Sequence, residues 1–330
     1  MFASCKKGAS PAPPPPEKTL TLTANKTQCY SDGFDEISFK VVNESGVDVT
    51  SSATVTRDNG VRVSTNKTYI STPGTYGYYA YIGSVQSATI FVVASAPPPS
   101  PYRQNVYLEN IISTNSSSFS ISTESEFSNS RRPYCKIADF HVNDSMQTPE
   151  GGILLTQYAL TNGPFVYMNR RTSLPFGATM TIRVDEETQK RSPLGIALES
   201  TITGNILNFR VKVGFSVNCT FPLNVACFLL EDSLIYNQTS PTFPNPPIVG
   251  FVHDNVFRKT LFEVRSGDPI PPSAQVNGTV WEKNYSFNLS NFNPNHCEIM
   301  VFVQYGSNEY GRSGVLNVQG VKAGQNKGFE

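Results

Sequence analysis

The chain has 330 residues, enough for two or three domains and a sizeable hydrophobic core. Its 26 basic and 26 acidic residues cancel, so composition gives no reason to expect nucleic acid or an anionic membrane surface as a partner. The apolar runs are all shorter than the roughly 18 residues of a transmembrane helix. Only 16% of the residues are charged, while Ser, Thr, Asn, Gly, Tyr and Phe are abundant. This mixture is typical of strand-rich extracytoplasmic proteins.

Residues 1–18 combine a lipoprotein-like start with a proline-rich tether. Phe2-Ala3-Ser4-Cys5 has the small residues before cysteine that mark a bacterial lipoprotein cleavage box, although a full secretory signal needs a longer apolar segment before it. We expect Cys5 to carry a lipid that anchors the protein to a membrane. The alternative is an ordinary cysteine in a disordered tail. The prolines that follow, up to Pro16, predict an extended spacer.

Residues 19–95 predict an all-β domain. About seven short alternating segments are separated by turn signals such as Asp58-Asn59-Gly60. The aromatic run from Tyr76 to Tyr81 and the closing run Ser87–Val93 resemble the last strands of bacterial immunoglobulin-like modules. Such modules usually act as spacers. Alternating core and surface positions explain the tyrosines better than a sugar-stacking row does.

A proline-rich linker at 96–104 leads to a predicted α/β unit at 105–175. The apolar run at 106–112, the strand at 137–144 and the strand after Pro164 follow the order of a thioredoxin-like unit. Redox chemistry in that fold needs a C-x-x-C pair just after the first strand. Residues 113–119 contain no cysteine, and the segment 120–132 is too short and polar for the full first helix. We therefore expect a degenerate scaffold without redox activity.

Residues 176–330 predict almost only strands. Asn208–Val217 alternates apolar and polar residues, and we expect it to pair with Leu223–Leu230. Later strands are expected near 285–289, 297–303 and 315–318, which favours a jelly-roll-like β-sandwich. The predicted fold is therefore mainly β with a small α/β unit: an immunoglobulin-like sandwich, a degenerate thioredoxin-like unit and a C-terminal sandwich.

The six cysteines give no metal-ligand spacing. Cys219 and Cys227 are separated by a Phe-Pro turn, so we expect a hairpin disulfide between them, or a disulfide from one of them to Cys297. Buried free thiols are the alternative. We predict no bound metal and no cofactor.

Three histidines, His141, His253 and His296, are the only imidazoles in the chain. His253 has Asp254 and Arg258 near it in sequence and is a candidate for a polar site or a metal ligand, although a structural hydrogen bond explains it more simply. His141 ends a predicted strand, where thioredoxin-like folds place groups that face a ligand, and a contact that caps Asp144 explains it equally well. The carboxylates of Glu231, Asp232 and Asp254 would be the ligands of a calcium site, but adjacent carboxylates in such a loop are more often solvated. The chain has no G-x-S-x-G, H-E-x-x-H or Walker-type motif.

Several of these segments resemble the outer membrane protein 28 family of Gram-negative envelope lipoproteins. The resemblance rests first on His141–Met146, Pro149-Glu150-Gly151, Gln157-Tyr158, Gly163-Pro164 and Tyr167-Met168-Asn169-Arg170. It continues through Leu230-Glu231-Asp232, His253–Arg258, Gly267–Pro271 and Leu316–Gln319. It implies that Pro164 matches the cis-proline of thioredoxin-like folds. Together with the reasoning on the histidines, this gives the candidate binding residues His141, Asn143, Asp144, Pro164, Asn169, Arg170, His253, Asp254 and Arg258.

The sequence thus predicts a non-enzymatic lipoprotein of the bacterial envelope, anchored to the outer membrane by lipid. It would bind or scaffold a protein, peptide or glycan partner, but not nucleic acid. One alternative is a protein derived from a thiol–disulfide oxidoreductase that keeps peptide binding around Pro164. Another is a carbohydrate-acting protein that uses the C-terminal sandwich.

Overall fold

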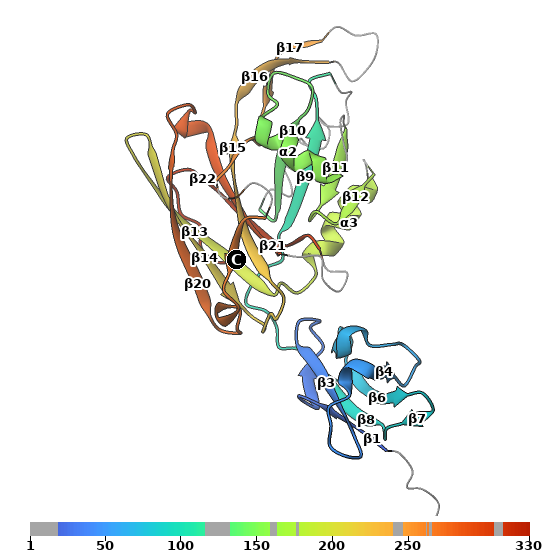
Figure 1. Ribbon diagram of the computed structural model, residues 1–330. Coiled ribbons are helices and arrows are strands. Elements are labelled where there is room, and N and C mark those ends of the chain that lie inside the picture. The colour runs from blue at the N-terminus through green and yellow to red at the C-terminus, as the bar shows by residue number, and fades with distance from the viewer. Residues whose placement is uncertain are drawn as a thin grey trace, which may run out of the picture. The chain divides into compact units, whose positions relative to one another are not determined.

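The computed structural model of the protein describes residues 19–115, 133–158, 164–175, 178–239, 247–261, 263, 266–306 and 313–330. The chain forms two compact units, Met1–Pro97 and Pro98–Glu330 (Figure 1). The division falls inside the proline-rich segment predicted as a linker at 96–104. The predicted tether at 1–18, including Cys5, lies outside the described residues.

Unit 1 is a sandwich of two β-sheets. One sheet has the order β1-β3-β5, and the other has the order β2-β8-β6-β4 with β7 paired to β6. The strands are β1 (Leu20–Ala24), β2 (Gln28–Tyr30), β3 (Glu36–Asn43), β4 (Thr54–Arg57), β5 (Lys67–Tyr69), β6 (Gly74–Ile82), β7 (Val85–Gln86) and β8 (Ile90–Ser95). Both sheets contribute to one apolar core. In β6, Tyr76 and Tyr78 are buried while Tyr79 is half-buried, so packing accounts for the aromatic strand.

Unit 2 is organised around a nine-stranded mixed sheet. Its order is β12-β11-β9-β10-β18-β15-β21-β22, and β19 pairs with β15. The strands are β9 (Val106–Ile112), β10 (Cys135–His141), β11 (Phe165–Met168), β12 (Thr172–Leu174), β15 (Leu223–Glu231), β18 (Val256–Thr260), β19 (Asp268–Ile270), β21 (Cys297–Tyr305) and β22 (Val315–Lys322). β10 is parallel to β9 and to β18. The other pairings are antiparallel.

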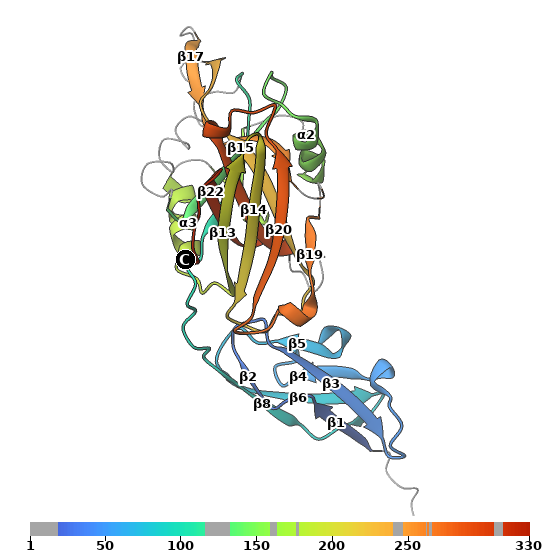
Figure 2. The same ribbon diagram turned by 90° about the vertical axis from the view of Figure 1, so that its left-hand side faces the viewer.

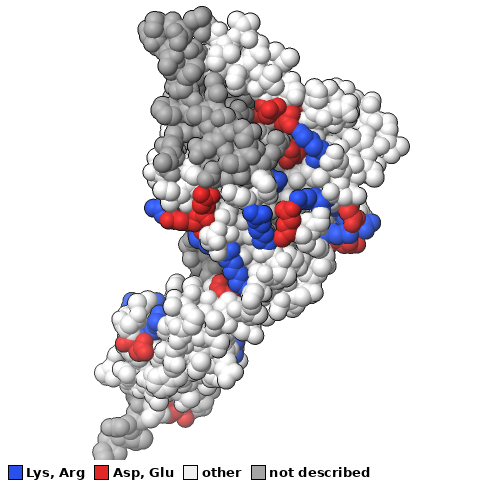
Figure 3. All heavy atoms as spheres, turned by 180° about the vertical axis from the view of Figure 1, so that it is seen from behind, with Lys and Arg blue, Asp and Glu red and all other residues white. Residues whose placement is uncertain are grey.

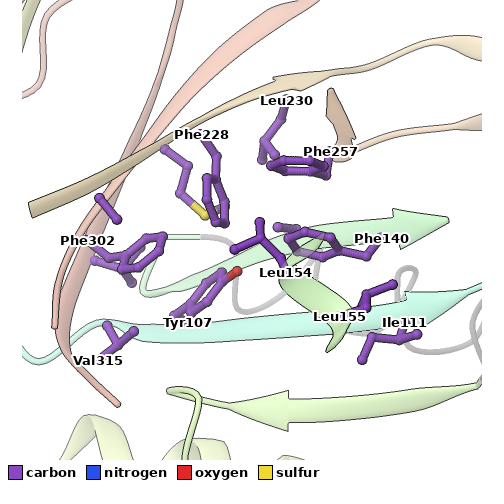
Figure 4. Close-up of a cluster of buried hydrophobic side chains, with 14 of the residues drawn as sticks. Tyr107, Ile111, Phe140, Leu154, Leu155, Phe228, Leu230, Phe257, Phe302 and Val315 are labelled. Atoms are coloured by element: carbon purple, nitrogen blue, oxygen red, sulfur yellow. The ribbon is translucent and has the colours of Figure 1, made fainter. Parts of the chain in front are cut away.

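Two helices cover the strands at the β9 end of this sheet. β9 is buried along its whole length, so its alternate residues enter two cores. Val106 and Leu108 belong to a core that includes residues of α3 (Ala178–Thr188). Tyr107 and Ile111 belong to the core that includes Leu154 and Leu155 of α2 (Pro149–Leu155), which Figure 4 shows. Thr148 caps α2: its hydroxyl oxygen accepts the Gly151 N–H at 3.0 Å.

The large sheet curls until strands far apart in its order meet. Asn105, just before β9, donates its side-chain N–H to Val318 O of β22 at 3.0 Å. Val315 N–H of β22 donates to Asn169 O, between β11 and β12, at 2.8 Å. The ring of Tyr107 stacks on that of Phe302 of β21, with centroids 4.9 Å apart. This curvature encloses the aromatic core of Figure 4.

A three-stranded sheet, β13-β14-β20, forms a further layer of unit 2, as Figure 2 shows. Its strands are β13 (Leu194–Thr203), β14 (Ile206–Phe215) and β20 (Val280–Asn288). The expected pairing of 208–217 with 223–230 is wrong, because β14 pairs with β13 and β20 while β15 pairs within the large sheet. The protein is nevertheless mainly β, with sheets packed in layers as predicted.

The predicted domain boundary near residue 175 does not separate compact units. β9 to β12 precede that position and β15 to β22 follow it, yet these strands share one hydrogen-bonded sheet. The pairing of β10 with β18 joins the two sequence halves directly. The α/β segment is therefore part of unit 2 rather than a separate domain.

The predicted disulfides are absent. Cys227 and Cys297 are free, buried cysteines. Cys227 lies opposite Val301, whereas Cys297 lies opposite Glu231, four residues further along β15. Four residues of strand span about 13 Å, and a disulfide joins Cα atoms only about 4.4–6.8 Å apart. The Cys219–Cys227 hairpin does not form because β14 and β15 belong to different sheets.

Unit 2 also contains a separate two-stranded sheet, and residues 240–246 between its strands lie outside the described residues. Its strands are β16 (Leu234–Gln238) and β17 (Ile248–His253). In the described part of the chain, no helix is long and apolar enough to cross a membrane.

Candidate functional site

A histidine and an aspartate meet at the carboxyl end of β10. His141 is the last residue of β10, and its Nδ1–H donates to Asp144 Oδ2 at 2.8 Å. Asp144 also accepts the backbone N–H groups of Thr114 and Met146. Burial favours the protonated acid, but His141 and the two backbone donors hold the pKa of Asp144 below its usual value. Of the two roles that the sequence left open for His141, the contact with Asp144 is present.

His253, at the end of β17, brings a second imidazole to the same place. The ring centroids of His141 and His253 are 5.3 Å apart, with the planes nearly perpendicular. Phe251 packs edge-on against His253 at 4.7 Å. Burial and His141 lower the pKa of His253 to about 4, and the opposing effect of Asp144 is smaller. His253 therefore stays neutral where an exposed histidine would titrate.

The histidine pair has the elements of a reactive site, but both rings are closed off from solvent. The Nε2 atom of each ring is buried and has no hydrogen-bond partner among the described residues. An imidazole oriented by a carboxylate is an arrangement found in general bases and in metal ligands. However, His141 is only 3% exposed and His253 only 2%. Within the described ranges, no group of three His, Cys, Asp or Glu side chains is placed to hold a metal ion.

The end of β16 hydrogen-bonds to the residues that directly follow β9. Thr239 N–H donates to Thr114 O at 2.8 Å, and the Gln238 amide donates to Ser113 O at 3.5 Å. Ser113 and Thr114 directly follow β9; residues 116–119, which replace the cysteine pair, lie outside the described residues. The carboxyl end of β9 is thus occupied by the chain's own backbone.

Asn169 and Arg170 form the tight turn between β11 and β12. Their φ angles are +50° and +56°, the pair of left-handed positions that a type I′ turn requires. Asn169 accepts the Tyr107 N–H at its Oδ1 (2.9 Å) and donates from Nδ2 to Glu187 (3.1 Å). Asn169 and Arg170, both predicted to bind a partner, therefore make structural contacts, and neither side chain projects into solvent.

Arg170 forms a buried ion pair with Glu109 of β9. The guanidinium donates through Nε at 2.8 Å and Nη2 at 2.6 Å to the same carboxylate oxygen, and through Nη1 to Gln304 at 3.0 Å. It also lies 4.8 Å from the centroid of the Phe302 ring. Although burial disfavours the charged form, Glu109 raises the pKa of Arg170 above its ordinary value.

Two tyrosines complete the surroundings of Glu109. Tyr107 donates its hydroxyl to Glu109 Oε1 at 2.9 Å, and Tyr158 donates to Oε2. Burial, reinforced by the carboxylate, raises the pKa of both phenols. Sequence reasoning missed Glu109. The signal was an acidic residue, next to Asn110, inside a buried and mainly apolar strand, where a carboxylate requires a buried cation or several donors.

The remaining predicted residues do not join one site. Asn143 is exposed and has a φ of +58°, and Pro164 is half-buried before β11. Asp254 accepts the Ser233 N–H at 2.9 Å. Arg258 pairs with Glu231 at 3.1 Å. Glu231 and Asp232 were expected to be solvated, but they are 6% and 8% exposed because Arg258 and Lys322 pair with them.

A pocket of about 540 Å³ lies on the three-stranded sheet of unit 2. Arg210 Nε donates to Asn284 Oδ1 at 3.0 Å, and Lys212 donates to Glu199. The ring of Tyr285 stacks on Phe209 with centroids 5.3 Å apart. The lining residues are Glu199, Ser200, Thr201, Asn208, Phe209, Arg210, Asn284, Tyr285 and Asn326. None was a sequence candidate; alternation alone predicted a half-buried strand here.

The family model of outer membrane protein Omp28 matches residues 153–327, more than half of the chain. The chain belongs to the Omp28 family. The resemblance seen in the sequence is thereby confirmed, and an envelope location is supported. The match covers Pro164, Asn169, Arg170 and the His253–Arg258 segment, whereas His141 and Asp144 precede it.

Two solved structures are similar to this Omp28 family member to different degrees. HBP35 of Porphyromonas gingivalis is 15% identical and superposes with a TM-score of 0.58, covering 68% of this chain and 76% of that one. Protein AGR_C_4864 from Agrobacterium tumefaciens is 12% identical with a TM-score of 0.41, covering 71% and 99%. No curated protein matches the chain. The likeness to HBP35 concerns the fold alone.

Proposed function

We propose that the protein is a lipid-anchored envelope protein with a binding or scaffolding role and no catalytic activity of its own. Cys5 would carry the lipid, unit 1 would be an immunoglobulin-like spacer, and unit 2 would bind the partner. Membership of the Omp28 family supports the envelope part of this proposal. The sealed histidine pair, together with the occupied carboxyl end of β9, favours binding over catalysis.

The pocket on β13-β14-β20 is the observation that carries the binding role. Its lining offers amides from Asn208, Asn284 and Asn326, along with a guanidinium, a carboxylate and hydroxyl groups. Closely spaced planar polar groups beside an aromatic ring suit the hydroxyl-rich surface of a sugar. Among protein, peptide and glycan partners, the pocket favours a glycan.

Titration of a panel of neutral and acidic oligosaccharides into the full chain tests this role. Asn284→Ala and Asn208→Ala each remove an amide from the pocket. We expect each to weaken binding about five- to thirtyfold, because losing one partner of a ligand hydrogen bond costs on the order of 1–2 kcal/mol. Ser286→Ala is the matched control: Ser286 is also exposed on β20 but does not line the pocket. Equal loss with the control, or no binding by the native chain, contradicts the pocket assignment.

Chemical crosslinking in native envelopes tests the anchoring and scaffolding parts separately. Mass spectrometry of the purified protein should find acyl chains on an N-terminal Cys5. An unacylated, soluble protein would remove the anchor from the proposal while leaving the pocket intact. Release of shortened products from a bound polysaccharide would instead assign a carbohydrate-acting enzyme.

The strand order β12-β11-β9-β10 favours a second candidate, a relic of a thiol–disulfide oxidoreductase. Parallel β9 and β10, with antiparallel β11 and β12 on the β9 side, fit a degenerate thioredoxin-like unit. Such a relic would keep peptide binding next to Pro164. Insulin reduction above an enzyme-free control would support retained activity. Its absence, with peptide binding that Pro164→Ala weakens, would support the relic.

A further inference from the structure

A second cavity of unit 2 lies between α3 and the hairpin of β11 and β12. Its volume is about 320 Å³, at the lower end of the range for small-molecule sites. Figure 1 shows α3 beside these strands, and Met180 and Val184 of α3 share one apolar core with Met168 and Leu174 of the hairpin. Met168 and Leu174 also line the cavity. A ligand of this cavity is therefore small and meets a partly apolar wall.

Most charged side chains along the wall of this cavity are paired with one another. Lys190 donates to Glu187, which is only 6% exposed and also accepts the Asn169 amide at 3.1 Å. Arg183 donates to Glu186 at 3.0 Å. Figure 3 shows acidic and basic side chains lying close together in the same way on one face of unit 2. These two pairs leave no net charge for a ligand.

Arg171 lines the same cavity and is paired differently. In the described part of the chain, its Nε–H donates to Ser313 O at 2.8 Å and its Nη2 group to Val315 O at 2.6 Å, and neither bond goes to a carboxylate. Carbonyl oxygens carry no formal charge, so they do not neutralise the guanidinium. Among the described lining residues, three cations stand against two carboxylates. One positive charge therefore remains for an anionic ligand.

The surrounding backbone holds the Arg171 side chain in place. Gly314 has a φ of +87°, and a Cβ there would lie 2.2 Å from Asn169 O and 2.4 Å from Arg171 Cγ. Only glycine lets the chain pass this close to the arginine. Arg171 Cζ also lies 5.9 Å from the centroid of the Tyr305 ring. A guanidinium that is already held loses less conformational entropy when it binds an anion.

The remaining edge of the Arg171 guanidinium suits a planar anion. The N–H donors of a guanidinium form a fixed planar fork. Ser313 O and Val315 O occupy the Nε–Nη2 edge, which leaves the Nη1 group and the second Nη2 hydrogen among the described contacts. Two neighbouring donors of this kind match the two oxygens of a carboxylate.

We propose that this cavity binds a small organic carboxylate and that Arg171 receives the carboxylate group. The carboxylate belongs to a free acid or to the carboxyl terminus of a peptide. An apolar group next to it contacts Met168 and Leu174. The cavity shares no lining residue with the pocket on β13-β14-β20, and the proposal does not depend on glycan binding.

Titration of N-acetyl-leucine into the full chain, followed by NMR, tests the proposal. We expect the amide signals of residues 168–174 and 183–190 to shift, with a dissociation constant of about 1 mM or below. N-acetyl-leucinamide has nearly the same shape without the charge and should bind at least about tenfold more weakly. An acetylated tripeptide with a free carboxyl terminus separates the two sources. Binding tighter than that of N-acetyl-leucine supports a peptide terminus, and weaker binding supports a free acid.

Substitutions then test the role of Arg171. Arg171→Gln should weaken the binding of N-acetyl-leucine at least about tenfold. Arg171→Lys keeps the charge without the planar fork and should also weaken it severalfold. Arg62→Gln is the matched control, because Arg62 is an exposed arginine of unit 1.

Three outcomes would overturn the proposal. Equal binding of N-acetyl-leucine and its amide would show that no carboxylate is recognised, and this comparison does not rely on the folding of a variant. Full affinity in the Arg171→Lys variant would exclude the two-donor contact. Tighter binding of inorganic phosphate than of N-acetyl-leucine would assign the cavity to phosphate instead.

Discussion

Arg170 occupies a backbone position that favours glycine or asparagine, and its side chain explains why arginine is there. The left-handed φ of +56° disfavours a residue with a Cβ, at a cost on the order of 1 kcal/mol. From this position the guanidinium reaches Glu109 and Gln304 inside the aromatic core. The turn therefore links β9, β11 and β21 through one buried charge pair.

Removing one member of this pair should be far more damaging than removing both. Glu109→Gln leaves the Arg170 cation buried without its counter-ion, and we expect a loss of about 3–5 kcal/mol in the free energy of unfolding. Glu109→Gln combined with Arg170→Met should recover part of this loss. Denaturant unfolding of the single and double variants measures the coupling. Additive losses would show that the two residues do not act as a pair.

His253 should make stability depend on pH. Its pKa is about 4 in the folded protein and about 6.5 when unfolded. Between these values the unfolded chain binds a proton that the native chain does not, so the free energy of unfolding falls as pH is lowered through this window, by up to about 3 kcal/mol. His253→Phe keeps an aromatic ring and should remove this slope. His296→Gln, which changes the half-buried third histidine, should leave it in place.

At the scale of elements, a ring from the linker supports the three-stranded sheet. Gly195 of β13 and Gly214 of β14 are directly opposite each other. A Cβ on Gly195 would lie 2.3 Å from Tyr102 Cδ1, and one on Gly214 would lie 2.2 Å from its Oη. Tyr102 therefore fills the space that two cross-strand side chains would otherwise occupy.

Gly195→Ala should expel the Tyr102 ring and cost about 2–3 kcal/mol of unfolding free energy. In a Tyr102→Ala background the same substitution should cost less than about 1 kcal/mol, because the space is then empty. Gly328→Ala is the control, since a Cβ there meets no atom within 4 Å. Thermal unfolding of the four variants gives the comparison. An unchanged cost in the Tyr102→Ala background would refute the packing explanation.

The sequence predicted elements better than it predicted their partners. Alternation identified the strand at 208–217, and a buried apolar run identified β9. Strand pairing depends on contacts between distant residues, so it was wrong for β14 and β15, which local periodicity cannot distinguish. The candidate site shows the same limit. His141 and Asp144 are three residues apart, and their contact was one of two roles that the sequence left open. His253 joins them only through the hairpin that follows β15.

At the scale of the whole molecule, the boundary of unit 2 is set by contacts of the linker itself. Arg191 donates from Nε to Pro98 O at 3.0 Å, and the hydroxyls of Ser100 and Ser216 are 3.1 Å apart. Tyr102 packs against the glycine pair and lies 5.5 Å from the ring of Phe329. Composition suggested a linker up to residue 104, but the residues from Pro98 onward belong structurally to unit 2.

Two fragments that differ only in residues 98–104 test whether unit 2 begins at residue 98 or at residue 105. Fragment 98–330 keeps the Pro98, Ser100 and Tyr102 contacts and should unfold at the temperature of unit 2 in the full chain. Fragment 105–330 lacks them and should lose about 3 kcal/mol, which lowers the midpoint by about 6–12 °C in a unit of this size. Calorimetry of both fragments beside the full chain makes the measurement. Equal unfolding temperatures for the two fragments would mean that residues 98–104 do not stabilise unit 2. A lower unfolding temperature for fragment 98–330 than for unit 2 in the full chain would mean that unit 1 stabilises unit 2.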